Sequence, residues 1–189
     1  AAVGGWLYWQ DQRAKDSAEQ SEQLFKLYDD IGKEELATVP KRLDALEDSH
    51  SDAVRATALF AAADVAIGQN DRKLAITKLR EAQDDDGLPQ PYRDIALIRV
   101  TALEFDTLKP DDVISRLEPL AKTGEPWFGS AGELTAMALL KQGKRNEAGR
   151  LFAAIAADKN VPDTIRSRAV QIAGTLGIDA SASLPFQAQ

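Results

Sequence analysis

One short apolar pattern recurs along this chain at a nearly fixed interval. In each copy, a small or branched apolar residue is followed four places later by a second apolar residue, and three places after that by a third. The copies begin at steps of 36, 38 and 35 residues; they are Val39/Leu43/Leu46, Ala75/Leu79/Ala82, Val113/Leu117/Leu120 and Ala148/Phe152/Ile155. A period of this length indicates stacked helix-turn-helix repeats, in which no unit buries its apolar face alone.

Prolines follow the same period. Pro89, Pro126 and Pro162 are 37 and 36 residues apart, and each stands just past one of the apolar sets. A proline near the end of each unit is typical of helical hairpins that stack into an array. Such an array buries a continuous core and leaves an open concave surface, which binds other molecules more often than it performs chemistry.

The composition favours a helical fold and argues against two classes of partner. With 189 residues, 44% of them hydrophobic and only 6% aromatic, the chain can bury a sizeable core between closely packed helices. The net charge of −7 argues against nucleic acid and against anionic lipid headgroups as partners. The absence of cysteine excludes disulfides and thiolate metal sites, and it leaves the redox compartment open.

Residues 1–9 are apolar and contain Trp6, Tyr8 and Trp9, and the chain turns polar directly after them. Nine residues cannot span a bilayer, which takes about 20 apolar residues. Aromatic residues beside a charged stretch are typical of a membrane–water interface. One interpretation is therefore the outer end of a truncated transmembrane helix, consistent with the missing initiator Met. The other is a helix whose apolar start packs on a neighbour.

Periodicity and turn residues predict the helices. A long helix over Gly5–Ile31 is expected to end at Gly32, and a final helix from Asp163 or Thr164 to end at Gly177 and cap the stack. Between them we expect Lys33–Glu47, then Ala53–Ile67 with Asp71–Gln83, Tyr92–Thr107 with Asp111–Lys122, and Phe128–Lys141 with Lys144–Asp158. Residues 178–189 are expected to form a mobile tail.

Small residues and turn residues fit a tetratricopeptide-like arrangement. Ala63 and Ala75 stand where two helices of a pair would cross closely, and Asn70 and Gly143 occupy turn positions that need a left-handed backbone. The repeat that begins near Pro91 departs most from the pattern. The predicted fold class is therefore all-α, a tetratricopeptide-like α-solenoid of about four helix pairs over residues 10–177, with a long N-terminal helix and a C-terminal capping helix.

Two segments carry a resemblance to a known family. The start Gly-Trp-x-Tyr-Trp at Gly5–Trp9 runs into a Ser-, Ala- and Gln-rich helix, and Gly124-Glu125-Pro126-Trp127 is followed by Ala138–Gly143 and Ala148. In these features the chain resembles the YfgM family, the ancillary subunits of the SecYEG translocon, from Gly5 to about Leu176. The acidic turn Asp84–Gly87 and the residues beyond Gly177 have no counterpart in that pattern.

The resemblance implies a location and partners. It implies a short cytoplasmic segment and one transmembrane helix before residue 1, so that the chain is the periplasmic domain of a single-pass inner-membrane protein. It also implies association with the Sec translocon and with the membrane-anchored periplasmic chaperone PpiD, in support of proteins that emerge across the membrane. The alternative is a soluble tetratricopeptide adaptor of another envelope or cytoplasmic complex.

The sequence offers no constellation for catalysis, a cofactor or a metal. His50 is the only histidine, and neither a second histidine nor a cysteine exists to complete a zinc site or a nucleophilic arrangement. The run Asp84-Asp85-Asp86-Gly87 lacks the alternation and the distal glutamate of a calcium loop. We therefore expect no enzyme activity, no cofactor and no small-molecule substrate.

The register of the repeats predicts a protein-binding groove along the first helix of each pair. Its expected inner positions are Phe60, Asp64 and Ile67, then Ile98, Ala102 and Phe105, then Glu133, Met137 and Leu140. Large apolar side chains with acids between them suit an apolar helix or extended segment of a partner. The other interpretation is that several of these residues belong to the core.

Overall fold

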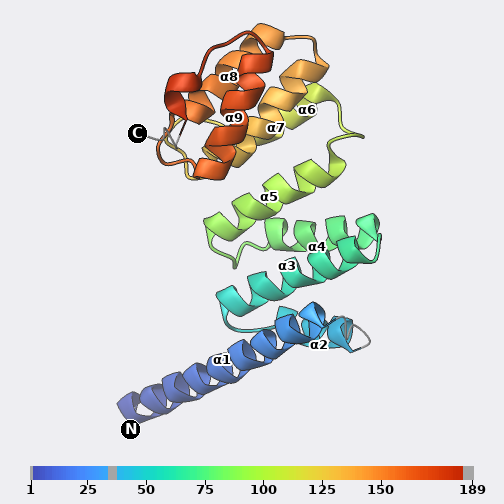
Figure 1. Cartoon of the computed structure of the whole chain (residues 1–189). Helices are drawn as coiled ribbons and strands as arrows, with labels where there is room; N and C mark the ends of the chain where they lie inside the picture. Colours follow the sequence, from blue (N-terminus) through green and yellow to red (C-terminus); the bar gives the residue numbers. More distant parts are fainter. Residues whose placement is uncertain (1, 34–37, 185–189) are drawn as a thin grey trace. The chain divides into compact units, whose positions relative to one another are not determined.

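The computed structural model describes the backbone of residues 2–33 and 38–184 (Figure 1). It also describes the side chains of these residues, except those of residues 2–14, 17 and 32. The described residues form nine α-helices and one short 3-10 helix, with no strand. The chain divides into two compact units, residues 1–97 and 98–189, with the division inside one helix.

The first unit contains four helices and the start of a fifth. Their bounds are α1 Ala2–Gly32, α2 Val39–Glu47, α3 Asp52–Gly68, α4 Arg72–Asp84 and α5 Gln90–Glu104, of which α5 continues into the second unit. Consecutive helices pack side by side, α1 on α2, α2 on α3 and α3 on α4, and α1 also contacts α3 (Figure 1). This is the succession expected of stacked helical hairpins.

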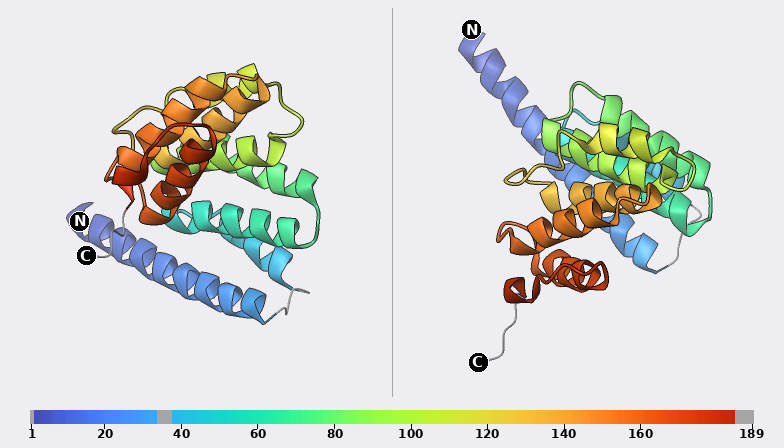
Figure 2. Two further views of the ribbon diagram at one scale, coloured as in Figure 1. Left: turned by 45° about the horizontal axis from the view of Figure 1, so that its top comes forward. Right: turned by 90° about the horizontal axis from the view of Figure 1, so that it is seen from above.

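The second unit begins with the end of α5 and contains four further α-helices. Their bounds are α6 Pro110–Leu117, α7 Phe128–Lys141, α8 Arg145–Ala157 and α9 Asp163–Thr175, followed by the 3-10 helix η1 Ser181–Ser183. Helix α7 packs on α6, α8 and α9, and α8 packs on α9. Figure 2 shows these helices from two further directions.

The recurring apolar sets form the core, as predicted. Every position in the four sets is buried. The sets lie on the second helix of each pair, namely α2, α4, α6 and α8, with Leu120 just beyond the end of α6. The periodic prolines instead precede the first helices, since Pro89, Pro126 and Pro162 stand just before α5, α7 and α9. The repeat period therefore corresponds to one first helix plus one second helix.

Close packing in the second unit depends on small residues. A Cβ on Gly129 of α7 would lie 2.7 Å from Val161 Cγ1, and one on Gly132 would lie 3.0 Å from Ile155 Cδ1. Ala136 and Ala148 are both fully buried in this core. Glycine and alanine thus bring α7 within close reach of its neighbours.

The turns follow the sequence prediction, but several helix ends differ from it; α5, for example, was expected over Tyr92–Thr107 and spans Gln90–Glu104. Asn70, Gly143 and Gly177 have positive φ values of 60°, 76° and 83°, the left-handed conformation that their residue types favour. Helix α6, expected to reach Lys122, ends at Leu117 because Pro119 follows and cannot supply a helical N–H. Helix α2 begins at Val39 rather than Lys33, and the intervening residues 34–37 lie outside the described part of the chain.

Residues 178–184, expected to belong to a mobile tail, are packed against the second unit. Ala180 is buried, and Ile178 packs against the hydrophobic core. Ser183 accepts a hydrogen bond through its carbonyl oxygen from Arg166 Nη2 at 3.1 Å. This correction has a simple cause: an apolar residue follows directly after the turn at Gly177. Residues 185–189 lie outside the described part.

Residues 2–9 form the first turns of α1, and the side chains of Trp6, Tyr8 and Trp9 lie outside the described part. No helix in the part of the chain that the structure describes is long and apolar enough to cross a bilayer. The interpretation of residues 1–9 as the outer end of a membrane helix therefore stays a prediction.

Candidate protein-binding faces

In the first unit, the predicted groove positions lie along one side of α3. Asp64 and Ile67 are exposed, and 42% of the Ile67 side chain is accessible. Phe60 is half-buried and packs against the cluster of Ala56, Leu59, Ala82, Leu88 and Ala96. We call Phe60, Asp64 and Ile67 the α3 face. On this face Ile67 is an accessible apolar side chain, whereas the Phe60 ring is partly buried against the core.

In the second unit, α7 presents the predicted positions Glu133, Met137 and Leu140. These residues recur at steps of four and three, so they share one side of the helix. Met137 is 42% exposed, whereas Leu140 is half-buried and packs against the core. We call Glu133, Met137 and Leu140 the α7 face. Met137 is its accessible apolar group, and its flexible thioether chain adapts to partners of different shape.

Both ends of the α7 face carry charges that are already paired within the unit. Glu133 accepts two hydrogen bonds from Arg168 of α9, from Nε at 2.8 Å and from Nη2 at 2.6 Å. The hydrogen bond to Glu133 is the main reason that the pKa of Arg168 is raised. Lys141 Nζ donates to the Phe105 carbonyl oxygen at 3.0 Å and lies 4.2 Å from the centre of the Phe105 ring.

Helix α5 departs from the predicted groove. Ala102 is exposed and Phe105 is half-buried, as inner positions allow, but only 7% of Ile98 is accessible. The expectation that Ile98 lines an open groove is therefore not met. Ala96, Val100 and Thr101 are buried as well. The other residues of α5 are half-buried or exposed, so Ile98 belongs to the buried side of this helix.

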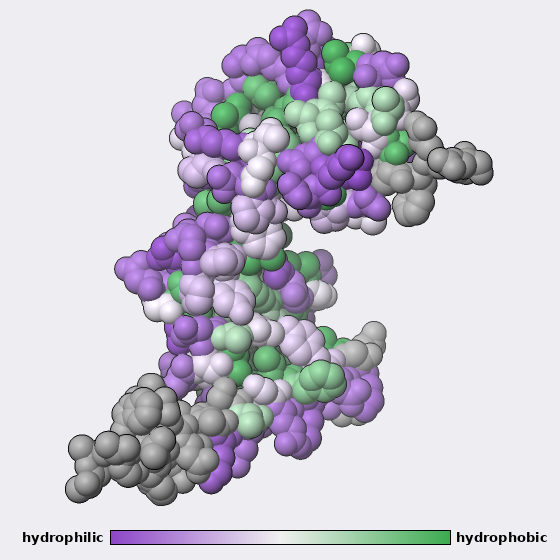
Figure 3. Space-filling model, turned by 90° about the vertical axis from the view of Figure 1, so that its left-hand side faces the viewer, coloured by the Kyte–Doolittle hydropathy of each residue, from purple (hydrophilic) through white to green (hydrophobic). Residues whose placement is uncertain are grey.

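Apolar groups are also distributed over the rest of the surface. Figure 3 shows one side of the molecule, on which apolar residues form small groups among hydrophilic ones. Phe25 on α1 is 81% exposed, and Leu74 on the second helix α4 is as exposed as Ile67. Exposure by itself therefore does not single out the α3 and α7 faces. Their common position on the first helices of the repeats does.

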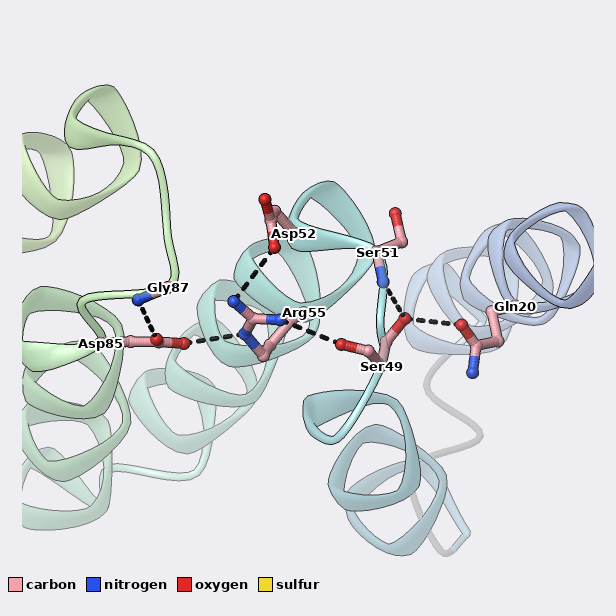
Figure 4. Close-up of polar contacts among 7 residues, drawn as sticks. All are labelled: Gln20, Ser49, Ser51, Asp52, Arg55, Asp85 and Gly87. Carbon is pink, nitrogen blue, oxygen red and sulfur yellow. Dashed lines mark hydrogen bonds and ion pairs between the residues drawn. The ribbon is translucent and has the colours of Figure 1, made fainter. Parts of the chain in front are cut away.

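The acidic turn Asp84–Gly87 is held by the first unit's own cations (Figure 4). Asp85 Oδ2 accepts from Arg55 Nε at 2.7 Å, and Asp85 Oδ1 accepts from the Gly87 N–H at 2.8 Å. Burial favours a higher pKa for Asp85, but the bonds from Arg55 and from backbone N–H groups outweigh it and lower the pKa. Asp86 pairs with Arg93 at 2.6 Å. The turn is thus a structural element.

The turn that contains His50 is held by hydrogen bonds of its neighbours Ser49 and Ser51, which Figure 4 shows. Ser49 is buried; its hydroxyl donates to Gln20 Oε1 and accepts from the Ser51 N–H. His50 itself is exposed. Among the described residues, no group of three or more His, Asp or Glu side chains is arranged to hold a metal ion.

Sequence reasoning missed a recurring arginine. Arg55, Arg93 and Arg166 are each the fourth residue of a first helix, and each bonds the residue that starts its helix, namely Asp52, Gln90 and Asp163. Each also reaches outside its helix, to Asp85, Asp86 and Ser183 respectively. The detectable signal was an acid or glutamine followed three places later by arginine, recurring 38 and 73 residues apart.

Stacked helical hairpins with internally paired charges and exposed apolar residues on their first helices define a helical-repeat scaffold of the protein-binding class. The model of the tetratricopeptide repeat-like domain family matches residues 1–173, and the chain belongs to this family. Tetratricopeptide-like repeat proteins are typically non-enzymatic scaffolds for protein–protein interaction. No curated protein and no solved structure gives a match to the chain.

Proposed function

We propose that this chain is the periplasmic part of a membrane-tethered scaffold that binds proteins at the Sec translocon. In this proposal a single-pass inner-membrane helix precedes residue 1. The repeats then associate with the translocon and with PpiD-like periplasmic chaperones, and assist proteins that emerge from the membrane. The supporting features are the family match over residues 1–173 and the sequence resemblance at Gly5–Trp9 and Gly124–Trp127.

The observation that carries the binding role is the exposure of Ile67 and Met137 on the first helices of their repeats. Both are large apolar side chains, and both are 42% exposed. Their charged neighbours at the α7 face are satisfied within the unit, since Glu133 pairs with Arg168 and Lys141 with Asp106. Because these charges are engaged, the face favours an apolar segment of a partner over a charged one.

In this proposal, tethering to the membrane brings the binding faces close to emerging chains. An anchor in the bilayer keeps the binding faces close to the exit of the channel, which raises their effective concentration for an emerging chain. Weak and unselective apolar contacts then suffice for transient capture. Such contacts also allow many different emerging segments to be bound.

The binding experiment compares two changes that differ in position but not in exposure. Ile67→Ser and Met137→Ser together remove the apolar groups of the α3 and α7 faces, and Leu74→Ser removes an equally exposed one from a second helix. We expect the double variant to lose at least about tenfold in affinity for an apolar peptide of the kind found in emerging chains, whereas Leu74→Ser retains it. Equal losses, or no loss, would contradict the assignment of the faces.

The proposed membrane anchor is tested separately, by reading the gene sequence upstream of residue 1. About 20 apolar residues directly upstream of residue 1, preceded by positive charge, are expected. In cells, crosslinks from the repeat domain to translocon subunits should then depend on that segment. A soluble extension in its place would favour the adaptor alternative.

A further inference from the structure

Met137 carries the only sulfur atom of the chain, since the sequence has one methionine and no cysteine. It is also the only exposed residue of α7 between Phe128 and Leu140, because every other residue in that range is buried or half-buried. Over most of its length, α7 therefore presents one accessible group, which is 42% exposed. A thioether in this position is open to attack by two-electron oxidants.

A peroxide oxidises a thioether in a single step. The sulfur atom attacks one peroxide oxygen, the O–O bond breaks and an S–O bond forms. Sulfur loses two electrons, and the second oxygen of hydrogen peroxide takes up the proton and leaves as water. The product, methionine sulfoxide, is polar and chiral, whereas the thioether is apolar and flexible. The reaction requires no catalytic group from the protein.

The charged residues one turn away from Met137 on either side are already engaged. Glu133 accepts hydrogen bonds from Arg168 at 2.8 and 2.6 Å, and Lys141 donates to the Phe105 carbonyl oxygen at 3.0 Å. Oxidation therefore places a hydrogen-bond acceptor on a face whose neighbouring donors are bonded to other acceptors, and water solvates it. An apolar partner that covers the face removes this water and leaves the sulfoxide oxygen buried without a donor.

Oxidation at Met137 leaves the core of the second unit unchanged. The apolar cluster that holds α7, α8 and α9 together is formed by alanine, valine, isoleucine, leucine and phenylalanine, and Met137 does not belong to it. Oxidation of a buried methionine disrupts a core, but an exposed one changes only the surface around it. The effect of the added oxygen is thus confined to the α7 face.

We propose that Met137 is a redox-sensitive modification site: peroxides convert it to the sulfoxide, and the oxidised α7 face releases its apolar partner. This inference rests on the proposed function, because it concerns the regulation of the same face. Methionine sulfoxide reductases remove the oxygen, one enzyme for each epimer, with a thiol reductant supplying the two electrons, so the change is reversible. The chain has no cysteine that could respond to an oxidant in its place.

The test compares two chains that carry their single sulfur atom at equally exposed positions. One is the wild type. The other combines Met137→Leu with Leu74→Met, which moves the thioether to α4, outside the binding faces, at a site that is 42% exposed like Met137. Each chain is treated with hydrogen peroxide, and mass spectrometry measures the gain of one oxygen, about 16 Da.

The affinity of each chain for the apolar peptide of the binding experiment is then compared with its own value before treatment. Fluorescence anisotropy measures it before oxidation, after oxidation and after incubation with both reductases, and circular dichroism checks the fold at each stage. We expect both chains to take up the oxygen, but only the wild type to lose at least about tenfold in affinity, which the reductases restore. Saturating peptide should slow the oxidation of Met137, because it covers the sulfur atom.

The possible failures are distinguishable. A wild type whose Met137 resists peroxide, or that keeps its affinity after oxidation, would overturn the proposal and leave the proposed function intact. An equal loss of affinity in the double variant would also overturn it, since the loss would not depend on the α7 face. A reduced wild type that does not bind the peptide at all would contradict the proposed function itself, and the proposal with it.

Discussion

Arg55 and Asp85 are 30 residues apart in sequence, and Arg55 Nε donates to Asp85 Oδ2 at 2.7 Å. Arg55 also donates to the Ser49 carbonyl oxygen at 3.0 Å and to Asp52 at 3.1 Å (Figure 4). One guanidinium group thus joins the turn before α3, the start of α3 and the loop after α4. This use of a planar group with several donors is specific to arginine.

Arg55→Ala should lower the free energy of unfolding by about 2–3 kcal/mol, because it leaves a carboxylate and a carbonyl group without their donor. Arg55→Lys should recover only part of this loss, since one ammonium group cannot serve three separated acceptors. Urea unfolding followed by circular dichroism measures both. Arg72→Ala, at an exposed position of α4, is the control and should change stability by less than about 0.5 kcal/mol. Equal effects of Arg55→Ala and Arg72→Ala would refute the role of Arg55.

Asp85 should make the free energy of unfolding decrease at acidic pH. Burial opposes its ionisation, but Arg55 and the N–H groups of Gly87 and Leu88 outweigh burial, so the pKa of Asp85 is lower in the folded chain. A lowered pKa stabilises the fold above the unfolded value, near 3.8, and this stabilisation disappears as the pH falls through the folded value. Asp85→Asn should therefore be less stable than the wild type at pH 7, and this difference should narrow as the pH falls from 7 to 2. The comparison is made by urea unfolding across this range, and a difference that does not narrow would contradict it.

Glu47 should change the pH dependence of stability in the opposite direction to Asp85. Burial raises its pKa although Lys78 Nζ lies 2.6 Å from Oε2, and its other oxygen, Oε1, is buried without a hydrogen-bond partner. A raised pKa stabilises the fold below the unfolded value, near 4.5, and this stabilisation is lost as the pH rises through the folded value.

Glu47→Gln removes that titration, and Lys78 keeps Glu81 at 3.3 Å. The stability of the variant relative to the wild type should thus increase between pH 4 and pH 7. Thermal unfolding across this range measures the trend, and a decrease would show that the pairing with Lys78 dominates.

The repeat pattern predicts very different losses of stability when two leucines of α4 are replaced by alanine. Leu79 belongs to a recurring apolar set and is fully buried, whereas Leu74 is 42% exposed. Leu79→Ala should cost about 2–5 kcal/mol because it removes buried contacts and leaves a cavity. Leu74→Ala should change stability by less than about 1 kcal/mol, since alanine is also a good helix former. Comparable losses in urea unfolding would contradict the assignment of the core from the period.

The buried core and the helix order could be predicted because they depend on local periodicity. Residues four and three places apart share one side of a helix, and Ala75, Leu79 and Ala82 of α4 are accordingly buried together. Turn chemistry was equally local: Asn70 and Gly143 adopt the left-handed conformation that their types allow. The end of α6 was missed because the apolar pattern continues past Pro119, where backbone chemistry rather than periodicity ends the helix.

The exposure of the predicted binding positions was harder to predict from the sequence than the core was. Periodicity places Ile98 and Met137 alike on the inner side, yet one is buried and the other exposed. The difference arises because the burial of a helix residue depends on which distant parts of the chain pack beside it, and periodicity does not contain that information. The arginine contacts of Arg55 and Arg166 were missed for a similar reason, since their partners lie 30 and 17 residues away. The packing of residues 178–184 likewise depends on α8.

The central claim is that the first-helix faces bind apolar segments of other proteins. Site-specific photocrosslinking tests it most directly, with the photoreactive amino acid placed at Ile67, at Met137 or at the equally exposed Leu74, in membrane vesicles that hold a translocating chain. The account predicts adducts with the emerging chain or with translocon subunits from Ile67 and Met137, and few from Leu74. Adducts of equal yield from all three positions, or from Leu74 alone, would contradict it.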